Sequence, residues 1–476
     1  MQEFLDQLQK QVPGLIIKAQ QADIDHACTD WRKRYQTTAL AVLEPANTKQ
    51  VQGIVKLCDQ FNVAISTQGG NTGLVGGAVP AAEGSAARRA HVVLKTGRIR
   101  ETLEIDESNL TLTASVGYTL HEIQEYALAH DLLFPLSLAS EGTCTLGGNL
   151  ASNAGGVAVL RYGNTRELCL GLEYVNAQGG LCGDLRGLRK NNTGYDLRHL
   201  LIGSEGTLGI VTTACMKVYP APKSRCVAWL NVDDIQAAVD ALGFLQSRLF
   251  SELSSYEWMN ANAIDVVQTH FPAKAPTCPG ASDHVLAEFT SLGPEPALRE
   301  QVTKTLEALL EEQTSVRNIA IAQNGREIET FWALRENISE AQAKEGLNVK
   351  HDVACTVSQL PVFHDMAMNA IEEYGVEVRP VLFGHLGDGN LHFNLSALKG
   401  VDSAAFLKQQ QGLLNELVHE TILQCGGTVS AEHGIGQLKA ELLREITSAS
   451  NYGAFVAIKQ AMDPKNLFNP GKLVLI

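Results

Sequence analysis

Two histidines flank a short turn in the segment Arg379–Leu395. Asp388-Gly389 lies between two apolar runs, and Asp-Gly between alternating residues is a strong hairpin signal. In a hairpin with a two-residue type I′ loop, His385 would face His392, with Cβ atoms about 4.5–5.5 Å apart. Two imidazoles at that spacing can bind one divalent metal ion, and Asn394 would lie on the same face. The alternative is a plain hairpin with two half-exposed histidines, but the opposed pair favours a metal site.

A second pair of chemically active residues is Glu432-His433, which follows an expected strand over residues 427–431. Adjacent residues of a regular strand point to opposite faces, so both side chains reach one site only where the backbone turns. Gly434 and Gly436 give the backbone that freedom. Without further information, the pair could equally be an exposed ion pair.

Composition narrows the class of protein. The chain has 476 residues, of which 45% are hydrophobic and 19% charged, so two soluble globular domains are expected. A net charge of −14 argues against nucleic acid or an anionic membrane as the main partner. Ten scattered cysteines without a Cys-x-x-Cys pair predict reduced thiols and a cytoplasmic protein. The polar start predicts no signal peptide. No apolar run approaches the ~20 residues that span a bilayer, so the alternative to a cytoplasmic location is peripheral attachment at the inner membrane.

Three segments are rich in Gly, Ser, Thr and Asn: residues 68–77, 135–156 and 190–211. The first holds five glycines in ten residues, which lets backbone N–H groups converge on an anion. It is neither a P-loop nor a G-x-G-x-x-G fingerprint. Together the three segments suit one long polar ligand with several phosphates; three unrelated surface loops are the alternative.

The elements that must position these residues are visible as periodic patterns. In the first half, we expect a helix after the N-cap Asn47, a strand over 63–67, a strand over 110–116, and a helix opened by a Thr119/Glu122 capping box. The texture changes at residues 220–224, our domain boundary, and strand–helix units follow, which predict a sheet with helices on one face. The expected strands are 226–232, 284–292 and 317–323, and the expected helices are 233–249, 295–313 and 327–344.

The glycine-rich segments resemble the FAD-binding domain of the vanillyl-alcohol oxidase/p-cresol methylhydroxylase family. The resemblance rests on Gly69–Gly73, Gly142–Asn149, Ser152–Gly156, Asn192–Leu197 and Ile202–Val211, which match in order and spacing. It implies an α+β fold of two subdomains over residues 35–220. The FAD pyrophosphate would lie against the first two of these motifs, and the adenosine end near Glu205–Ile210. The residues implied to bind FAD are Gly69, Gly70, Asn71, Thr72, Gly73, Glu141, Gly142, Thr143, Gly147, Gly148, Asn149, Ser152, Ala154, Gly155, Gly156, Glu205, Gly206, Ile210 and Asn469.

We expect this FAD to be non-covalent. Some members of the family attach FAD through a histidine in the first loop, but no His or Cys lies between Ser66 and Ala78. The family often has Arg where this chain has Gln68, a departure that removes a charge near the phosphates and bears only on affinity.

The second half resembles the C-terminal FAD-linked oxidase domain of D-lactate and D-2-hydroxyglutarate dehydrogenases. The resemblance is carried by His385–His392, Ser430–Gly436, Asp463–Lys472 and the stretch from Trp332 to Lys350. It implies an α+β substrate domain with a mainly antiparallel sheet over residues 221–462. An N-terminal helical segment, residues 1–34, would precede the FAD domain, and a tail, residues 463–476, would return to it.

The same resemblance implies roles for the site residues. His385, His392 and Glu432 would bind a divalent metal, Zn²⁺ or else Mn²⁺ or Co²⁺. His433 would be the general base. Arg335 and Ser339, four apart on one helix face, would contact the substrate together with Lys350 and Asn394. The reaction would be the oxidation of a D-2-hydroxy acid to the 2-oxo acid by hydride transfer to flavin N5.

Within this group we favour D-2-hydroxyglutarate over D-lactate, since two cations and a metal could serve two carboxylates. The alternatives are a non-redox flavin transferase of the alkyl-dihydroxyacetone-phosphate synthase type, a metal hydrolase without flavin, and a non-catalytic flavin subunit. The expected partners are a small anionic 2-hydroxy acid and an electron acceptor such as electron-transfer flavoprotein or quinone, with a homodimer as one form of assembly.

Overall fold

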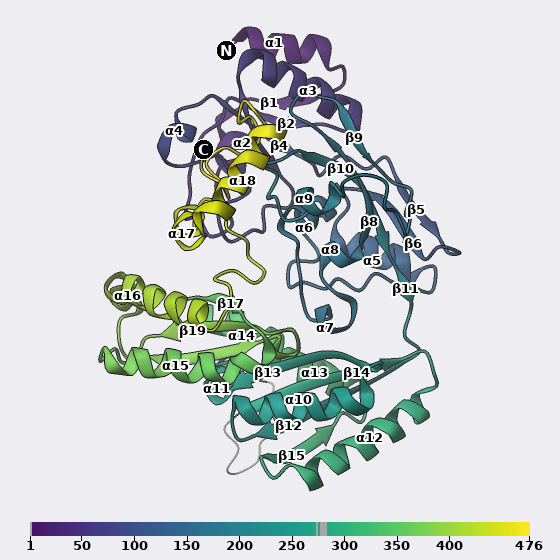
Figure 1. The fold of residues 1–476 in the computed structure, drawn as a ribbon, viewed down its shortest axis with the longest axis vertical. Coiled ribbons are helices and arrows are strands. Elements are labelled where there is room, and N and C mark those ends of the chain that lie inside the picture. Colours follow the sequence, from purple (N-terminus) through teal and green to yellow (C-terminus); the bar gives the residue numbers. More distant parts are fainter. Residues whose placement is uncertain (1, 273–274, 277–282) are drawn as a thin grey trace. The chain divides into compact units, whose positions relative to one another are not determined.

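The computed structural model describes residues 2–272, 275–276 and 283–476 (Figure 1). It divides into two compact units. The first comprises residues 1–155, 163–220 and 432–476, and the second comprises residues 156–162 and 221–431. The break at Pro220 coincides with the expected domain boundary. The chain re-enters the first unit at Glu432, whereas the sequence placed this return at residue 463.

The first unit contains a four-stranded sheet in the order β1-β2-β4-β3. Its central strand β4 runs parallel to β2 and β3. The predicted helix after Asn47 is confirmed as α3 (Thr48–Phe61), because the Asn47 side chain accepts a hydrogen bond from the backbone N–H of Gln50. The strands are β1 (Ile16–Lys18), β2 (Val42–Glu44), β3 (Ala64–Gln68) and β4 (His91–Lys95).

A second, antiparallel sheet of the first unit has the order β5-β6-β10-β8-β9. The Thr119/Glu122 capping box is confirmed at the start of α5 (Leu120–Leu128), where each residue bonds the backbone N–H of the other. The unit also contains a two-stranded sheet of β7 (Leu132–Leu133) and β11 (Tyr219–Pro220), and its two larger sheets agree with the predicted two-subdomain α+β fold. The strands are β5 (Leu103–Asp106), β6 (Thr111–Ser115), β8 (Cys169–Val175), β9 (Leu181–Asp184) and β10 (Ile210–Lys217).

The remaining elements of the first unit are short connections and terminal helices. They are α1 (Gln2–Gln11), α2 (Gln21–Ala27), α4 (Gly84–Ala87), β7 (Leu132–Leu133), α6 (Leu146–Ser152), α8 (Thr165–Leu168), α9 (Arg198–Leu201), β11 (Tyr219–Pro220), α17 (Ala440–Ile446) and α18 (Ala449–Met462). The C-terminal tail lies along β3, since the N–H of Ile65 donates to the carbonyl of Leu467 and the N–H of Asn469 donates to the carbonyl of Ile65, each at 2.8 Å.

The second unit is built on one eight-stranded antiparallel sheet, as predicted. Its order is β15-β12-β14-β13-β18-β19-β16, and β17 also pairs with β19. The strands are β12 (Ser224–Val232), β13 (Leu253–Asn260), β14 (Asp283–Ser291), β15 (Val316–Ile321), β16 (Asn348–Val349), β17 (Asp352–Ala354), β18 (Arg379–Gly384) and β19 (Asn390–Ser396). The helices are α7 (Val159–Tyr162), α10 (Ile235–Leu249), α11 (Ala261–His270), α12 (Glu295–Glu312), α13 (Gly325–Glu336), α14 (Ile338–Glu345), α15 (Leu360–Glu373) and α16 (Ser403–Gln424).

Helices cover both faces of this sheet, and the expectation of helices on one face is wrong. Trp229 and Met259 on one face belong to a buried cluster with Ile264 of α11 and Phe331 of α13. Tyr256 points to the opposite face, where its hydroxyl donates to the carbonyl of Ala238 on α10. The strands are apolar on both faces, which is the pattern of a sheet buried on both sides.

The expected helix 327–344 is divided at Asn337. Arg335 lies buried near the end of α13, whereas Ser339 is exposed on α14. The prediction that these two side chains share a helix face is therefore wrong. Their spacing of four residues is helical, but the chain changes element between them.

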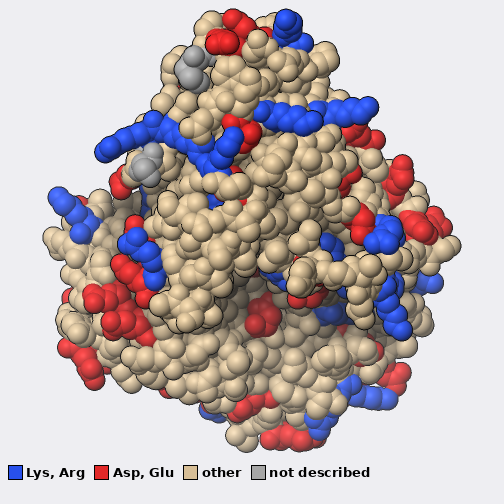
Figure 2. Space-filling model, turned by 45° about the horizontal axis from the view of Figure 1, so that its top comes forward, with Lys and Arg blue, Asp and Glu red and all other residues tan. Residues whose placement is uncertain are grey.

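On the face shown in Figure 2, Lys and Arg side chains are interspersed with Asp, Glu and uncharged residues. No helix within the described ranges is long and apolar enough to cross a membrane.

Candidate active site

The hairpin around Asp388 has a different register from the predicted one. His392 pairs with Phe383, not with His385. Strand β18 ends at Gly384, and Leu386–Asp388 form a turn of 3-10 helix in place of a two-residue loop. This longer turn satisfies its own backbone, because the N–H groups of Asp388 and Gly389 each donate to a carbonyl three residues back, at 3.2 Å. At Gly389, φ is +90° and an added Cβ would lie 2.1 Å from the carbonyl O of Cys355, a contact that the hairpin sequence does not encode.

The two imidazoles nevertheless come together. Their ring centroids are 5.9 Å apart. Side chains alternate along a strand with a period of two, so a register shift of two residues keeps His392 on the same face. His385 reaches that face from just beyond the end of β18. The expectation of two neighbouring histidines at this turn thus agrees with the structure, although the pairing behind it was wrong.

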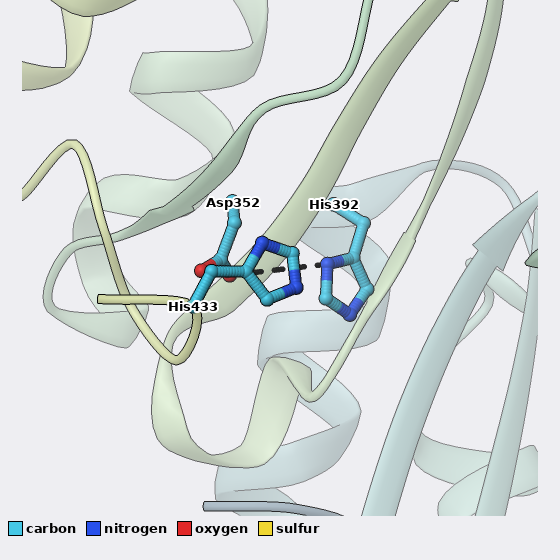
Figure 3. A group of neighbouring side chains, drawn as sticks. All are labelled: Asp352, His392 and His433. Atoms are coloured by element: carbon cyan, nitrogen blue, oxygen red, sulfur yellow. Dashed lines mark ion pairs between the residues drawn. The ribbon is translucent and has the colours of Figure 1, made fainter. Parts of the chain in front are cut away.

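Glu432 and His433 join this pair in two overlapping groups. His385, His392 and Glu432 have ligand atoms within 4.8 Å of one another, and so do Asp352, His392 and His433. Figure 3 shows the second group, with both imidazoles beside the carboxylate of Asp352. Glu432 directly follows Ala431, whose N–H donates to the carbonyl of Asp352 at 3.2 Å. The turn needed to bring both side chains of Glu432-His433 to one place occurs there, with φ of +79° at Gly434.

Asp352 is a residue that the sequence did not reveal. It lies on β17 directly opposite His392, and its carboxylate is 3.9 Å from Nδ1 of that histidine. Its side chain is only 1% exposed. The pairing of β17 with β19 is a tertiary contact, and a single Asp before Val353 carries no local motif that would have indicated it.

Glu257 on β13 is a second residue that sequence reasoning missed. Its side chain is fully buried, and its two oxygens lie 2.7 Å from Nδ1 of His385 and 2.8 Å from Nε of Arg335. Burial alone would raise the pKa of Glu257, but the electrostatic attraction and hydrogen bonds of His385 and Arg335 outweigh it and lower the pKa below its ordinary value. A carboxylate thus links one expected metal ligand to one expected substrate contact.

The four expected substrate contacts differ in their surroundings. Arg335 is buried, with its guanidinium 4.8 Å from the ring centroid of Phe383. Asn394 is buried on β19 and donates from its side chain to Oε1 of Gln342 at 2.9 Å. Ser339 is exposed, and Lys350 is exposed between β16 and β17.

In the first unit, the expected FAD loops meet backbone to backbone. A Cβ added to Gly70 would lie 2.0 Å from the carbonyl O of Thr143, and one added to Gly69 would lie 2.5 Å from Oγ1 of Thr145. The first two glycine-rich segments are therefore in direct contact, which only glycine permits. The third segment joins them in part: the N–H of Glu205 donates to the carbonyl of Ala151 at 2.8 Å, whereas residues 190–196 are exposed.

The C-terminal tail completes this region. The side chain of Asn469 donates to the carbonyl of Glu205 and accepts from the N–H of Thr67. Lys472 is buried and donates from Nζ to the carbonyl of Gly77 at 2.9 Å. The carboxylate of Glu205 accepts the N–H groups of Ile435 and Gly436, each at 2.7 Å. Two segments from the end of the chain, residues 435–436 and 469–472, thus contact the expected FAD loops.

Several polar atoms of β3 and α6, beside these loops, are suited to a ligand. Ser66 Oγ, Thr67 Oγ1 and Asn149 Nδ2 are buried, and none has a hydrogen-bond partner among the described residues. Burial of such groups without a partner costs about 1–3 kcal/mol each. The two loops joined at Gly70 and the unsatisfied atoms beside them fit a bound FAD, whose phosphates and ribose hydroxyls can supply the missing partners.

Replacement of Gly70 by alanine tests the loop contact. The added Cβ would collide with a backbone carbonyl, so the two loops must separate, and we expect FAD retention to fall at least about tenfold. The measurement is the flavin absorbance relative to protein after gel filtration. Gly97→Ala is the matched control, since nothing lies within 4 Å of a Cβ at that position. Equal FAD retention in both variants would contradict the prediction.

Lys472 predicts a pH dependence of stability. Burial lowers its pKa to about 7, although Glu205 acts in the opposite direction. Between pH 7 and 10 the unfolded chain holds this proton more tightly than the folded chain does, so the free energy of unfolding should rise with pH through this range. Urea unfolding at pH 7 and pH 9 should show a smaller change for Lys472→Met than for the unaltered chain. An identical pH dependence in both would refute the assignment.

Comparisons with known proteins place this chain in a family. Residues 39–182 match the family described as FAD binding domain, and residues 221–473 match FAD linked oxidases, C-terminal domain. The chain is 34% identical to D-2-hydroxyglutarate dehydrogenase of Xanthomonas citri pv. viticola, over 98% of this chain and 96% of the relative. It is 33% identical to the mitochondrial D-2-hydroxyglutarate dehydrogenase of Bos taurus, over 99% and 84%.

Solved structures share the fold at low sequence identity. p-Cresol methylhydroxylase with substrate bound superposes with a TM-score of 0.74 at 16% identity, covering 100% of this chain and 98% of that one. An alkyldihydroxyacetonephosphate synthase superposes with a TM-score of 0.72, also at 16% identity, covering 99% and 84%. These likenesses establish the fold and say nothing of the substrate.

Proposed function

This chain belongs to the family of FAD-linked oxidases within the vanillyl-alcohol oxidase/p-cresol methylhydroxylase flavoproteins and is an FAD-dependent oxidoreductase, and from this premise we propose that it oxidises D-2-hydroxyglutarate to the 2-oxo acid. The observation that carries the proposal is the group formed by His385, His392 and Glu432 in a chain with an FAD-binding domain. Two imidazoles and a carboxylate are the ligand set of a catalytic divalent metal with open positions. The similarity to D-2-hydroxyglutarate dehydrogenases over nearly the whole chain supports the substrate.

The reaction needs three things from the site. FAD would supply the acceptor of the C2 hydrogen, and a divalent ion, which His385, His392 and Glu432 would hold, would supply Lewis acidity toward the C2 hydroxyl. His433 accepts the hydroxyl proton on an imidazole nitrogen. The carboxylate of Asp352 lies in the same group, with an oxygen within 4.8 Å of a ring nitrogen of His433.

The proposed substrate has two carboxylates, and the chain offers cations for them. The Nε of Arg335 donates a hydrogen bond to Glu257. The terminal nitrogens of Arg335 are therefore the atoms that would bind a carboxylate of the substrate. We assign Lys350 and Ser339 to the more exposed part of the substrate and Asn394 to its oxygens near the metal. The reduced flavin would pass its electrons to an acceptor such as electron-transfer flavoprotein or quinone.

Anaerobic flavin bleaching tests the proposal. We expect D-2-hydroxyglutarate to bleach the flavin faster than D-lactate or D-malate, and L-lactate to leave it oxidised. A chelator should suppress the bleaching, and added Zn²⁺ or Mn²⁺ should restore it. Preferential bleaching by D-lactate would reassign the substrate, and a flavin that no hydroxy acid reduces would overturn the proposal.

A further inference from the structure

Glu257 contacts both a proposed metal ligand, His385, and a proposed substrate contact, Arg335. Its carboxylate is fully buried on β13, with one oxygen on Nδ1 of His385 and the other on Nε of Arg335. We propose that Glu257 is a positioning residue that makes His385 a metal ligand through Nε2 and orients Arg335 toward the substrate. This inference rests on the metal site proposed above and adds to it a residue that does not touch metal or substrate.

The effect on His385 follows from the chemistry of the hydrogen bond. Arg335 can only donate, so one oxygen of Glu257 accepts from it. An ionised carboxylate has no donor, so its other oxygen accepts as well. His385 must then carry its proton on Nδ1, which leaves the lone pair on Nε2 for a metal. A buried carboxylate behind an imidazole fixes both the tautomer and the ring orientation, and loss of such a partner typically weakens metal binding about 10–100-fold.

The effect on Arg335 follows from the same contact. One oxygen of Glu257 fixes Nε, and the guanidinium lies over the ring of Phe383 at 4.8 Å. Phe383 is also the strand partner of His392, and the two rings are 4.9 Å apart. Arg335, His385 and His392 are therefore each supported by Glu257 of β13 or Phe383 of β18, and both strands belong to the second unit.

Glu257→Gln separates the two hydrogen bonds without changing side-chain volume. The amide oxygen must face Arg335, because two donors would otherwise meet, and the amide NH₂ then faces Nδ1 of His385. That arrangement places the imidazole proton on Nε2 and blocks the proposed ligand atom. We expect the dissociation constant for Zn²⁺, measured by competition with a chromophoric chelator, to rise about 10–100-fold. FAD content should stay unchanged.

Glu345→Gln is the matched control. Glu345 also lies between an arginine and a histidine of the second unit, Arg379 and His270, but outside the site. Its replacement should leave the Zn²⁺ affinity within about twofold of the unaltered chain. Equal Zn²⁺ affinity in Glu257→Gln and the unaltered chain would overturn this inference alone. Failure of the unaltered chain to bind Zn²⁺ would instead overturn the proposed metal site.

The unaltered chain provides a test that does not depend on a variant folding. Long-range ¹H–¹⁵N correlation spectra of the zinc-loaded, histidine-labelled protein report which ring nitrogen binds metal, and the His385 signal is identified by its loss in His385→Asn. We expect a metal-bound Nε2 and a protonated Nδ1 at His385. Binding of zinc through Nδ1 would exclude the role of Glu257.

Discussion

Replacing His433 with alanine is expected to leave FAD bound and to slow flavin reduction by D-2-hydroxyglutarate about 10²–10⁴-fold. This is the usual contribution of a general base, and His433 is the residue that we propose accepts the hydroxyl proton. The measurement is anaerobic stopped-flow absorbance of the flavin at saturating substrate. Because the rate is taken at saturation, weaker substrate binding would not produce the loss.

The control for this experiment is His364→Ala. His364 is a partly buried histidine on α15 that pairs with Asp365 and lies against Trp258, a residue that points to the opposite face of β13 from Glu257. Its replacement should leave flavin reduction within about twofold. Normal reduction in His433→Ala would remove His433 from the mechanism, and loss of FAD in that variant would show a structural role instead.

Replacing His392 with alanine is expected to abolish metal binding, and activity with it. His392 is the one residue shared by both groups of potential ligands, so its loss breaks either set. Metal content measured by atomic emission should fall to background, and added Zn²⁺ should not restore flavin reduction. Activity that survives both this replacement and exhaustive chelation would refute a metal-dependent reaction.

Two further variants distinguish the two groups. If the metal is held by His385, His392 and Glu432, Glu432→Gln should lose zinc, and Asp352→Asn should retain most of it. If Asp352, His392 and His433 hold the metal, the order reverses. We expect the first outcome, because the resemblance to hydroxyacid dehydrogenases assigns Glu432 as the ligand and His433 as the base.

Local signals predicted most of the regular structure. Side-chain capping at Asn47 and Thr119 is decided by residues three apart, so the starts of α3 and α5 could be predicted from the sequence. The division of the predicted helix at Asn337 could not, since a spacing of four residues between Arg335 and Ser339 is equally helical in one element or two. The helices on both faces of the large sheet were also missed, because apolar strands show that both faces are covered without showing by what.

The sequence by itself determined the residue types of the site: two histidines at a glycine turn, a Glu-His pair, and glycine-rich loops. Such loops are required only where another backbone segment or a ligand approaches closely. Only the tertiary structure decided the register at this turn, because Gly389 packs against Cys355, the residue that follows β17. It alone also revealed Asp352 and Glu257. A buried carboxylate is stabilised by the partners that the fold brings to it, and His392, His385 and Arg335 are distant in sequence from the residues that they contact.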